Sequence, residues 1–261
     1  MAPKIALGAL VRRVSGRVLP LRPSWSVDGV GLQNRQSSRS TLDGLIPPEI
    51  TNDAFSETIV EIASRAGVRE ILEIGSSSGS GSTESWVQGA LLNCELPRLH
   101  CIEVSIPRFV ALSERWREHG FVNCYNVSSV PLELFPSPAE VTQFYYEAQS
   151  DLSHYQLELV LHWLQQDIDY LRTHGLSGNG IRHIKELHDL NTFDAVLIDG
   201  SEFTGSAELD EVYGARFILM DDTRTFKNWN NFERLRKDTE YRLHSESSRT
   251  RHGYAVFERI H

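Results

Sequence analysis

Short apolar segments that end on a glycine or an acidic residue recur along this chain and alternate with segments of helical periodicity. REILEIG (69–75) runs into a glycine-rich turn, and LHCIE (99–103) ends on a glutamate. FDAVLID (193–199) and ARFILMD (215–221) both end on an aspartate. Strands that alternate with helices form a parallel sheet with helices on both faces, so this pattern predicts an α/β fold.

Three more segments complete the predicted sheet. VNCYNV (122–127) follows the first two strands, and YRLHSE (241–246) and YAVFERI (254–260) follow the two strands that end on aspartate. A short polar, basic turn separates the final pair, which predicts an antiparallel hairpin at one edge. We therefore expect a doubly wound, mostly parallel seven-stranded sheet with an antiparallel edge hairpin.

Residues 131–190 interrupt this alternation. The segment is too long for a loop within a compact domain, and its apolar residues favour helices. These residues are Phe144, Tyr145, Leu152, Leu157, Leu161, Trp163, Leu164 and Ile168. We expect a helical insertion that lies over the strand ends. Alternatively, the segment packs on the flank of the sheet or forms a dimer contact. The formation of a homo-oligomer is therefore left open.

The first forty residues differ from the rest of the chain in charge. They hold seven Lys and Arg residues and one acidic residue, whereas the whole chain has a net charge of −9. We therefore predict a basic N-terminal arm over residues 1–45 and one domain over residues 46–261 that contains the insertion. The acidic domain argues against nucleic-acid binding, because phosphate contacts need a basic face.

Three interpretations of the arm are open. It is an arm that frays or packs on a partner, a basic helix of residues 1–20 on an anionic membrane surface, or a targeting peptide. A membrane span needs about 20 apolar residues in a row, and the sequence has no such run. The three cysteines lack CxxC spacing, which argues against a disulfide scaffold or a structural zinc site and favours a reducing, cytoplasmic location.

The turn after the first strand is a candidate cofactor loop. In EIGSSSGSGST, the glycines Gly75, Gly79 and Gly81 let the backbone turn tightly and approach a ligand closely. Serine hydroxyls such as that of Ser76, with free amides at the start of the next helix, can bind a polar group. Glu103 ends the second strand, where it either accepts both hydroxyls of a ribose or caps the next helix. Together these features predict a cofactor that contains a nucleoside.

Two other nucleotide-binding classes fit poorly. Short-chain dehydrogenases need a Tyr-xxx-Lys pair, and none of the eight tyrosines has a lysine four residues later. No Gly-Lys-Ser/Thr follows the loop, as a nucleotide P-loop would require. Hydride transfer and phosphoryl transfer are therefore disfavoured.

ILEIGSSSGSGST, LHCIE, VLIDG and ILMDD, in this order, resemble the motifs of the class I S-adenosylmethionine-dependent methyltransferases, a Rossmann-like family. The resemblance covers residues 51–130 and 190–260. It implies that Glu103 binds the ribose and that Ser128 lies on the adenine side, where the family's usual acidic residue is missing. It also implies a set of residues around the methionine part of the cofactor: Glu73, Gly75, Gly79 and Gly81.

Three aspartates follow two of the strands. Asp199 ends the fourth strand, and Asp221 and Asp222 end the fifth, so they converge if these strands are neighbours. Such oxygen ligands suit Mg²⁺, although Asp222 could instead cap a helix and Asp199 a turn. The arrangement resembles metal-dependent O-methyltransferases of the catechol and sugar types, and the adjacent Asp-Asp pair is closer to the sugar type.

The resemblance implies that Mg²⁺ would lower the pKa of an acceptor hydroxyl. A catechol-type enzyme places a lysine shortly after the strand-four aspartate, but Gly200-Ser201-Glu202-Phe203 follows here. Lys227, Glu202 and a metal-bound aspartate stay open as the base, and Lys227 and Asp199 are the predicted catalytic residues.

We expect a methyltransferase that uses S-adenosylmethionine and Mg²⁺ to methylate a hydroxyl of a small molecule. A sugar unit is the first candidate for this acceptor. Two alternatives are a metal-dependent, hydroxylase-like enzyme on the same fold and a non-catalytic, cofactor-binding scaffold.

Overall fold

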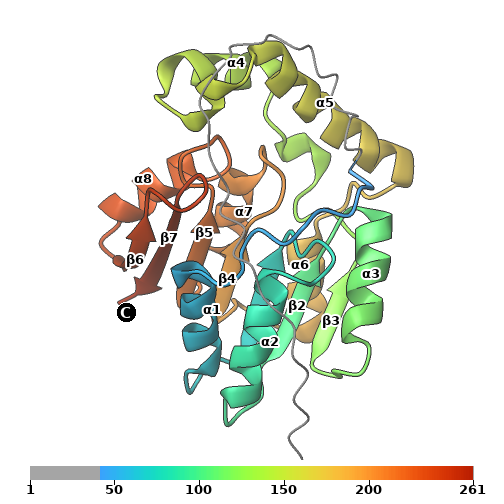
Figure 1. Cartoon of the computed structure of the whole chain (residues 1–261), viewed down its shortest axis with the longest axis vertical. Helices are drawn as coiled ribbons and strands as arrows, with labels where there is room; N and C mark the ends of the chain where they lie inside the picture. Colours follow the sequence, from blue (N-terminus) through green and yellow to red (C-terminus); the bar gives the residue numbers. More distant parts are fainter. Residues whose placement is uncertain (1–41, 261) are drawn as a thin grey trace, which may run out of the picture. The chain divides into compact units, whose positions relative to one another are not determined.

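The computed structural model describes residues 42–260, and their centre is one seven-stranded sheet (Figure 1). Its strand order is β3-β2-β1-β4-β5-β7-β6. Strands β1 to β5 run parallel, and β7 is antiparallel to both β5 and β6. The strands are β1 Glu70–Ile74, β2 Arg98–Ile102, β3 Val122–Tyr125, β4 Ala195–Ile198, β5 Phe217–Asp221, β6 Tyr241–Ser247 and β7 Tyr254–Arg259. The predicted sheet and its edge hairpin are confirmed.

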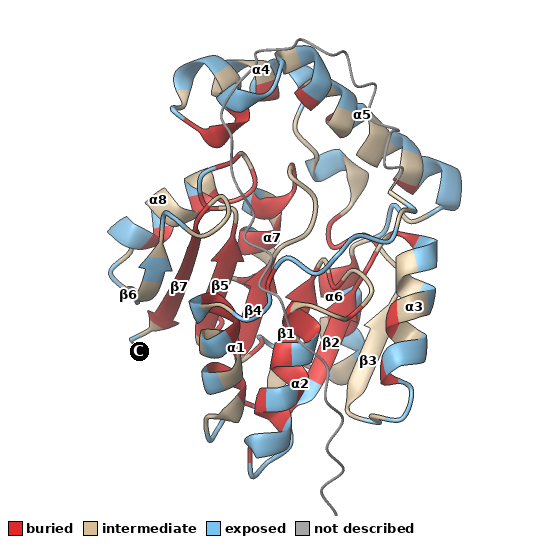
Figure 2. Ribbon diagram, in the orientation of Figure 1, coloured by how far each residue is buried: buried red, intermediate tan, exposed pale blue. Residues whose placement is uncertain are grey.

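Helices cover both faces of the sheet because successive strand residues point to opposite sides. One face carries α1 (Ala54–Ser64), α2 (Ser82–Leu92) and α3 (Ile106–Trp116), whose apolar residues pack with Ile71 and Leu197. The other face carries the second group of helices, which packs with Leu72 and Val196. That group consists of α6 (Gly180–His188), α7 (Gly205–Val212) and α8 (Trp229–Lys237). Strands β4 and β5 are buried along their whole length, as Figure 2 shows.

The segment 131–190 is helical, as predicted. Helices α4 (Pro138–Glu147) and α5 (Leu157–His174) lie beyond the carboxyl ends of the strands (Figure 1), with two short 3-10 turns at 132–134 and 151–154. A separate apolar cluster holds them there, in which Val141, Val160 and Leu164 pack on Phe203 after β4. The last helix of the segment, α6, instead covers the sheet face, so the insertion over the strand ends stops after α5.

The predicted arm falls almost entirely outside the described residues, and its three interpretations stay predictions. Residues 42–50 are described, and several of them line the cavity considered below. Within residues 42–260, no helix has the length and apolar character that crossing a membrane would require.

Candidate functional site

The loop after β1 is shaped by two glycines with left-handed backbone. Gly75 has a φ of +87°, and a Cβ there would lie 2.1 Å from the carbonyl oxygen of Asp199. Gly79 has a φ of +74°, and its carbonyl accepts a hydrogen bond of 3.0 Å from the indole of Trp116. Only glycine therefore lets this loop lie against both β4 and α3.

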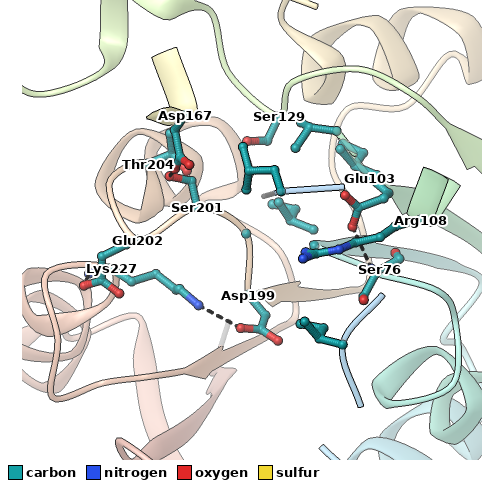
Figure 3. Close-up of a pocket in the computed structure, with 18 of the residues that line it drawn as sticks. Ser76, Glu103, Arg108, Ser129, Asp167, Asp199, Ser201, Glu202, Thr204 and Lys227 are labelled. Atoms are coloured by element: carbon teal, nitrogen blue, oxygen red, sulfur yellow. Dashed lines mark hydrogen bonds and ion pairs between the residues drawn. The ribbon is translucent and has the colours of Figure 1, made fainter. Parts of the chain in front are cut away.

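A cavity of about 380 Å³ lies at the carboxyl ends of β1, β2 and β4 (Figure 3). The segment 46–50 and residues Tyr170 and Leu171 of α5 also line it. Most of the site residues predicted from the sequence line it: Gly75, Ser76, Gly81, Glu103, Ser128, Asp199, Asp222 and Lys227. The fold thus brings together residues that are up to 152 positions apart, from Gly75 to Lys227.

Glu73 and Gly79 do not line the cavity. The Glu73 side chain is fully buried, and its Oε2 accepts a hydrogen bond of 2.6 Å from the Thr83 hydroxyl in α2. Burial raises the pKa of the Glu73 carboxyl. Both residues therefore support the loop from behind, and direct contact of Glu73 with a cofactor stays a prediction.

Glu103 is oriented by two backbone amides. Its Oε2 accepts from Ser77 N at 2.8 Å and its Oε1 from Ser105 N at 2.7 Å. A carboxylate has about four lone-pair positions, so both oxygens can still accept ribose hydroxyls. The cap of α3 is Ser105, whose hydroxyl accepts from Arg108 N. Burial raises the pKa of Glu103, which is 5% exposed.

Ser128 lines the cavity, its place on the adenine side stays a prediction, and its hydroxyl is already hydrogen-bonded. It donates a hydrogen bond of 2.6 Å to the carbonyl of Val130. Arg108 also lines the cavity, and its Nε donates to the Gly44 carbonyl at 2.8 Å. Arg108 was not predicted as a site residue, because an arginine in the first turn of a helix carries no signal of its own.

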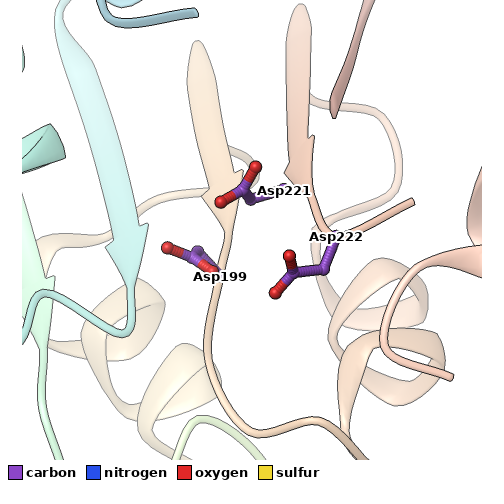
Figure 4. Close-up of side chains that lie close together, drawn as sticks. All are labelled: Asp199, Asp221 and Asp222. Atoms are coloured by element: carbon purple, nitrogen blue, oxygen red, sulfur yellow. The ribbon is translucent and has the colours of Figure 1, made fainter. Parts of the chain in front are cut away.

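The three aspartates converge as predicted (Figure 4). One carboxylate oxygen from each of Asp199, Asp221 and Asp222 lies within 4.8 Å of the others. Strands β4 and β5 are direct neighbours, and this brings their carboxyl ends together.

Lys227 lies between two of these carboxylates. Its Nζ donates to Asp199 Oδ1 at 2.9 Å and to Asp222 Oδ2 at 2.8 Å, and its side chain is 7% exposed. Burial alone would lower the pKa of Lys227, but Asp199 and Asp222 raise it well above its usual value. Lys227 is therefore an ammonium ion and a poor candidate for the base.

Asp221 is paired with a different cation. Arg251, in the turn between β6 and β7, donates to both carboxylate oxygens, at 2.9 and 3.1 Å. The same guanidinium also pairs with Asp53, the cap of α1. Asp221 is 1% exposed and does not line the cavity.

The donor atoms have the chemistry that Mg²⁺ prefers, but four of the six carboxylate oxygens already accept hydrogen bonds from Lys227 or Arg251. A divalent ion would have to displace the Lys227 ammonium and compete with the two-pronged contact from Arg251. As arranged here, these residues do not fit a magnesium ion.

Two further carboxylates face the cavity near Lys227 (Figure 3). Glu202 accepts from Lys227 N at 3.2 Å and from the Thr225 hydroxyl at 3.1 Å, and burial raises its pKa to about 7. Asp167, on α5, accepts from the Ser201 hydroxyl at 2.5 Å, and burial raises its pKa to about 6. Glu202 was a predicted candidate for the base. Asp167 was not predicted, because only the packing of the insertion brings it to the site.

No family model and no curated protein matches the chain. Solved structures do match it, at identities at which the similarity concerns the fold. An O-methyltransferase from Bacillus cereus in complex with SAH is 13% identical over 82% of this chain and 84% of that one, with a TM-score of 0.48. An SAH-bound methyltransferase from Podospora anserina is 14% identical over 79% and 78%, with a TM-score of 0.43.

The similarity extends to a methyltransferase from Geobacter sulfurreducens, which is 9% identical over 82% of this chain and 81% of that one, with a TM-score of 0.44. The chain's own topology identifies the fold more directly. Five parallel strands, an antiparallel β7 between β5 and β6, and a glycine loop after β1 match what the sequence motifs imply. The described chain therefore has the doubly wound, mostly parallel seven-stranded α/β fold that the sequence predicts.

Proposed function

We propose that this protein transfers the methyl group of S-adenosylmethionine to a hydroxyl of a small molecule. One observation carries the proposal: a single cavity is lined by the glycine loop, by Glu103 and by the acidic cluster around Lys227. In an open α/β sheet, ligands bind at this carboxyl edge.

The cofactor half of the cavity lies between β1 and β2. The amides of Gly75 and Ser76 already donate to the Ile102 carbonyl, so the amide of Gly81 at the cap of α2 and the Ser76 hydroxyl are the groups that can bind the methionine part. Glu103 supplies acceptors for the ribose hydroxyls. When bound, the cofactor supplies an electrophilic methyl group on a sulfonium sulfur. Ser128 also lines the cavity and can contact the adenine only by packing, because its amide and carbonyl are hydrogen-bonded to Leu176 and Gly180.

The acceptor half is the acidic end of the cavity. Glu202 is the base that we favour, because a carboxyl with a pKa of about 7 is half ionised near neutral pH. It takes the proton of the acceptor hydroxyl as the oxygen forms its bond to the methyl carbon. The carbon–sulfur bond breaks, and the sulfur keeps the electron pair.

A polar acceptor with several hydroxyls, such as a sugar unit, suits this end of the cavity. Asp167, Asp199, Glu202 and Asp222 all line it and can accept hydrogen bonds from hydroxyl groups. The carboxylates predicted to bind magnesium are paired with Lys227 and Arg251. No step of the proposal therefore depends on a metal.

Calorimetric titration with S-adenosylmethionine tests the cofactor site. We expect the wild type to bind and Glu103→Ala to bind at least about tenfold more weakly, because ribose hydrogen bonds are lost. Glu118→Ala, which changes an exposed glutamate beyond α3, is the matched control and should bind like the wild type. A folded wild type that binds no cofactor would refute the methyltransferase proposal and favour a scaffold of another kind.

A further inference from the structure

We infer that the Lys227 ammonium occupies the place of the divalent cation of metal-dependent O-methyltransferases, so that this protein carries its own cation. The location of the cation follows from contacts within the chain. Its catalytic role rests on the methyl transfer proposed above.

The contacts of Lys227 are those of a bound cation. The ammonium lies 2.9 Å from one oxygen of Asp199 and 2.8 Å from one of Asp222, the two aspartates of the cluster that line the cavity. Residues 42–260 contain no other ammonium or guanidinium paired with these two carboxylates. A divalent ion bound by Asp199 and Asp222 would lie beside this ammonium and be repelled by its charge, so the two cations compete for the cluster.

The backbone around Lys227 is fixed to the sheet, which places the ammonium without a metal. The side-chain amide of Asn228 donates to the carbonyls of Ile198 at 3.1 Å and Asp221 at 2.6 Å, and so joins the ends of β4 and β5. Gly205 packs beneath the Lys227 carbonyl, where a Cβ would lie 1.9 Å from the oxygen. Asn228 is therefore a positioning residue for Lys227.

The third carboxylate of the cluster does not offer another metal position. Asp221 has both oxygens paired with Arg251, and that guanidinium is itself held by Asp53. A guanidinium fork on a carboxylate is among the stronger ion pairs in proteins. A metal bound at this cluster would lose Asp221 as a ligand.

The ammonium still has one hydrogen to donate. An ammonium has three N–H groups, and Asp199 and Asp222 receive two of them. Within the described part of the chain, Nζ has no third acceptor, and Lys227 lines the cavity. The third N–H can donate to the acceptor oxygen and stabilise the negative charge that develops as Glu202 takes the proton. Lys227 stays protonated throughout.

Binding of Mn²⁺ to the full-length, EDTA-treated protein tests this inference without cofactor or acceptor. We expect the wild type to bind no Mn²⁺ at millimolar concentrations, by calorimetry and by the electron paramagnetic resonance signal of free Mn²⁺. Lys227→Ala exposes two carboxylates and should gain one site, at least about tenfold tighter than any binding by the wild type. Lys237→Ala, at an exposed lysine of α8, and Lys227→Arg should resemble the wild type.

Wild-type binding of one Mn²⁺ that Asp222→Asn abolishes would overturn the inference. The inference would also be overturned if the Lys227→Ala variant folds but gains no Mn²⁺ site. If Lys227→Ala does not fold, Mn²⁺ binding by the wild type and by Asp222→Asn still tests the inference. Absence of Mn²⁺ binding in both proteins supports an internal cation. Once an acceptor is known, the wild-type rate should be insensitive to EDTA, and Lys227→Ala should lose about 10²-fold in kcat. Failure of the methyltransferase proposal appears separately, in the cofactor titration.

Discussion

At the scale of single residues, Glu202 should govern the pH dependence of the reaction. The base must be ionised to accept the hydroxyl proton, and burial raises the pKa of Glu202 to about 7. We therefore expect kcat/KM to rise with pH, to bend near pH 7 and to be constant above it. Glu202→Gln should lower kcat by about 10²- to 10⁴-fold, the usual contribution of a general base, with cofactor affinity unchanged.

The control for this prediction is the second carboxyl on the acceptor side. Asp167 has its pKa raised only to about 6, so Asp167→Asn should keep the bend near pH 7. Profiles of kcat/KM for the three proteins distinguish the two carboxyls. A Glu202→Gln enzyme with the full wild-type profile would assign the base to another residue.

The residues that the sequence revealed at this site are those that directly follow a strand. Gly75, Glu103 and Asp199 could be found because a strand pattern ends beside each of them, and strand ends meet at one edge of the sheet. Their partners could not be found in this way. Arg251 and Asp167 come from a turn and from an insertion helix, and nothing in their local sequence indicates which carboxylate or cavity they contact.

At the scale of elements, the turn between β6 and β7 connects two distant parts of the fold through Arg251. It pairs with Asp221 at the end of β5 and with Asp53 at the start of α1. Removal of one partner of a buried ion pair costs about 3–5 kcal/mol, because the other charge is left buried. We expect Arg251→Ala to lose about this much free energy of unfolding near pH 8, measured by urea denaturation.

The loss should depend on pH in a stated direction. Without the guanidinium, burial raises the pKa of Asp221 further, so the folded variant binds a proton more tightly than its unfolded chain. The difference from the wild type should therefore shrink as the pH falls towards 5. Arg249→Ala, at an exposed arginine of the same turn, should match the wild type at every pH. A deficit of equal size at pH 5 and pH 8 would show that lost packing, and not a buried charge, is responsible.

The strands and helices could be predicted from the sequence better than the surfaces on which they pack. Strands β4 and β5 have continuous apolar runs because a parallel sheet buries them on both faces, and this pattern predicts them well. The sequence of segment 131–190 predicted helices, but it did not show which helices lie over the strand ends and which one covers the sheet face. Helix α6 buries Ile181 and Ile184 against the sheet, whereas α5 buries Val160 and Leu164 in the separate cluster. Both helices are amphipathic, and amphipathicity does not show which surface a helix packs on.

At the scale of the described domain, the cavity joins segments that are far apart in the chain. It is lined by the segment 46–50, the loop after β1, helix α5 and the loop that contains Lys227. A ligand in the cavity contacts all of them at once and binds only the folded state. It should therefore stabilise the whole domain, by about 2.7 kcal/mol when its free concentration is 100 times its Kd.

Hydrogen exchange can show where this stabilisation acts. With S-adenosylmethionine, we expect the added protection to be greatest in segment 46–50 and the first turns after β1, which line the cavity. Strand β6 lies at the far edge of the sheet, and its added protection should reflect only the global change. Glu103→Ala at the same cofactor concentration is the control and should show neither the thermal shift nor the local protection. Protection spread evenly over the sheet, and equal in Glu103→Ala, would place the cofactor outside this cavity, because only a ligand that contacts the lining segments can slow their opening selectively.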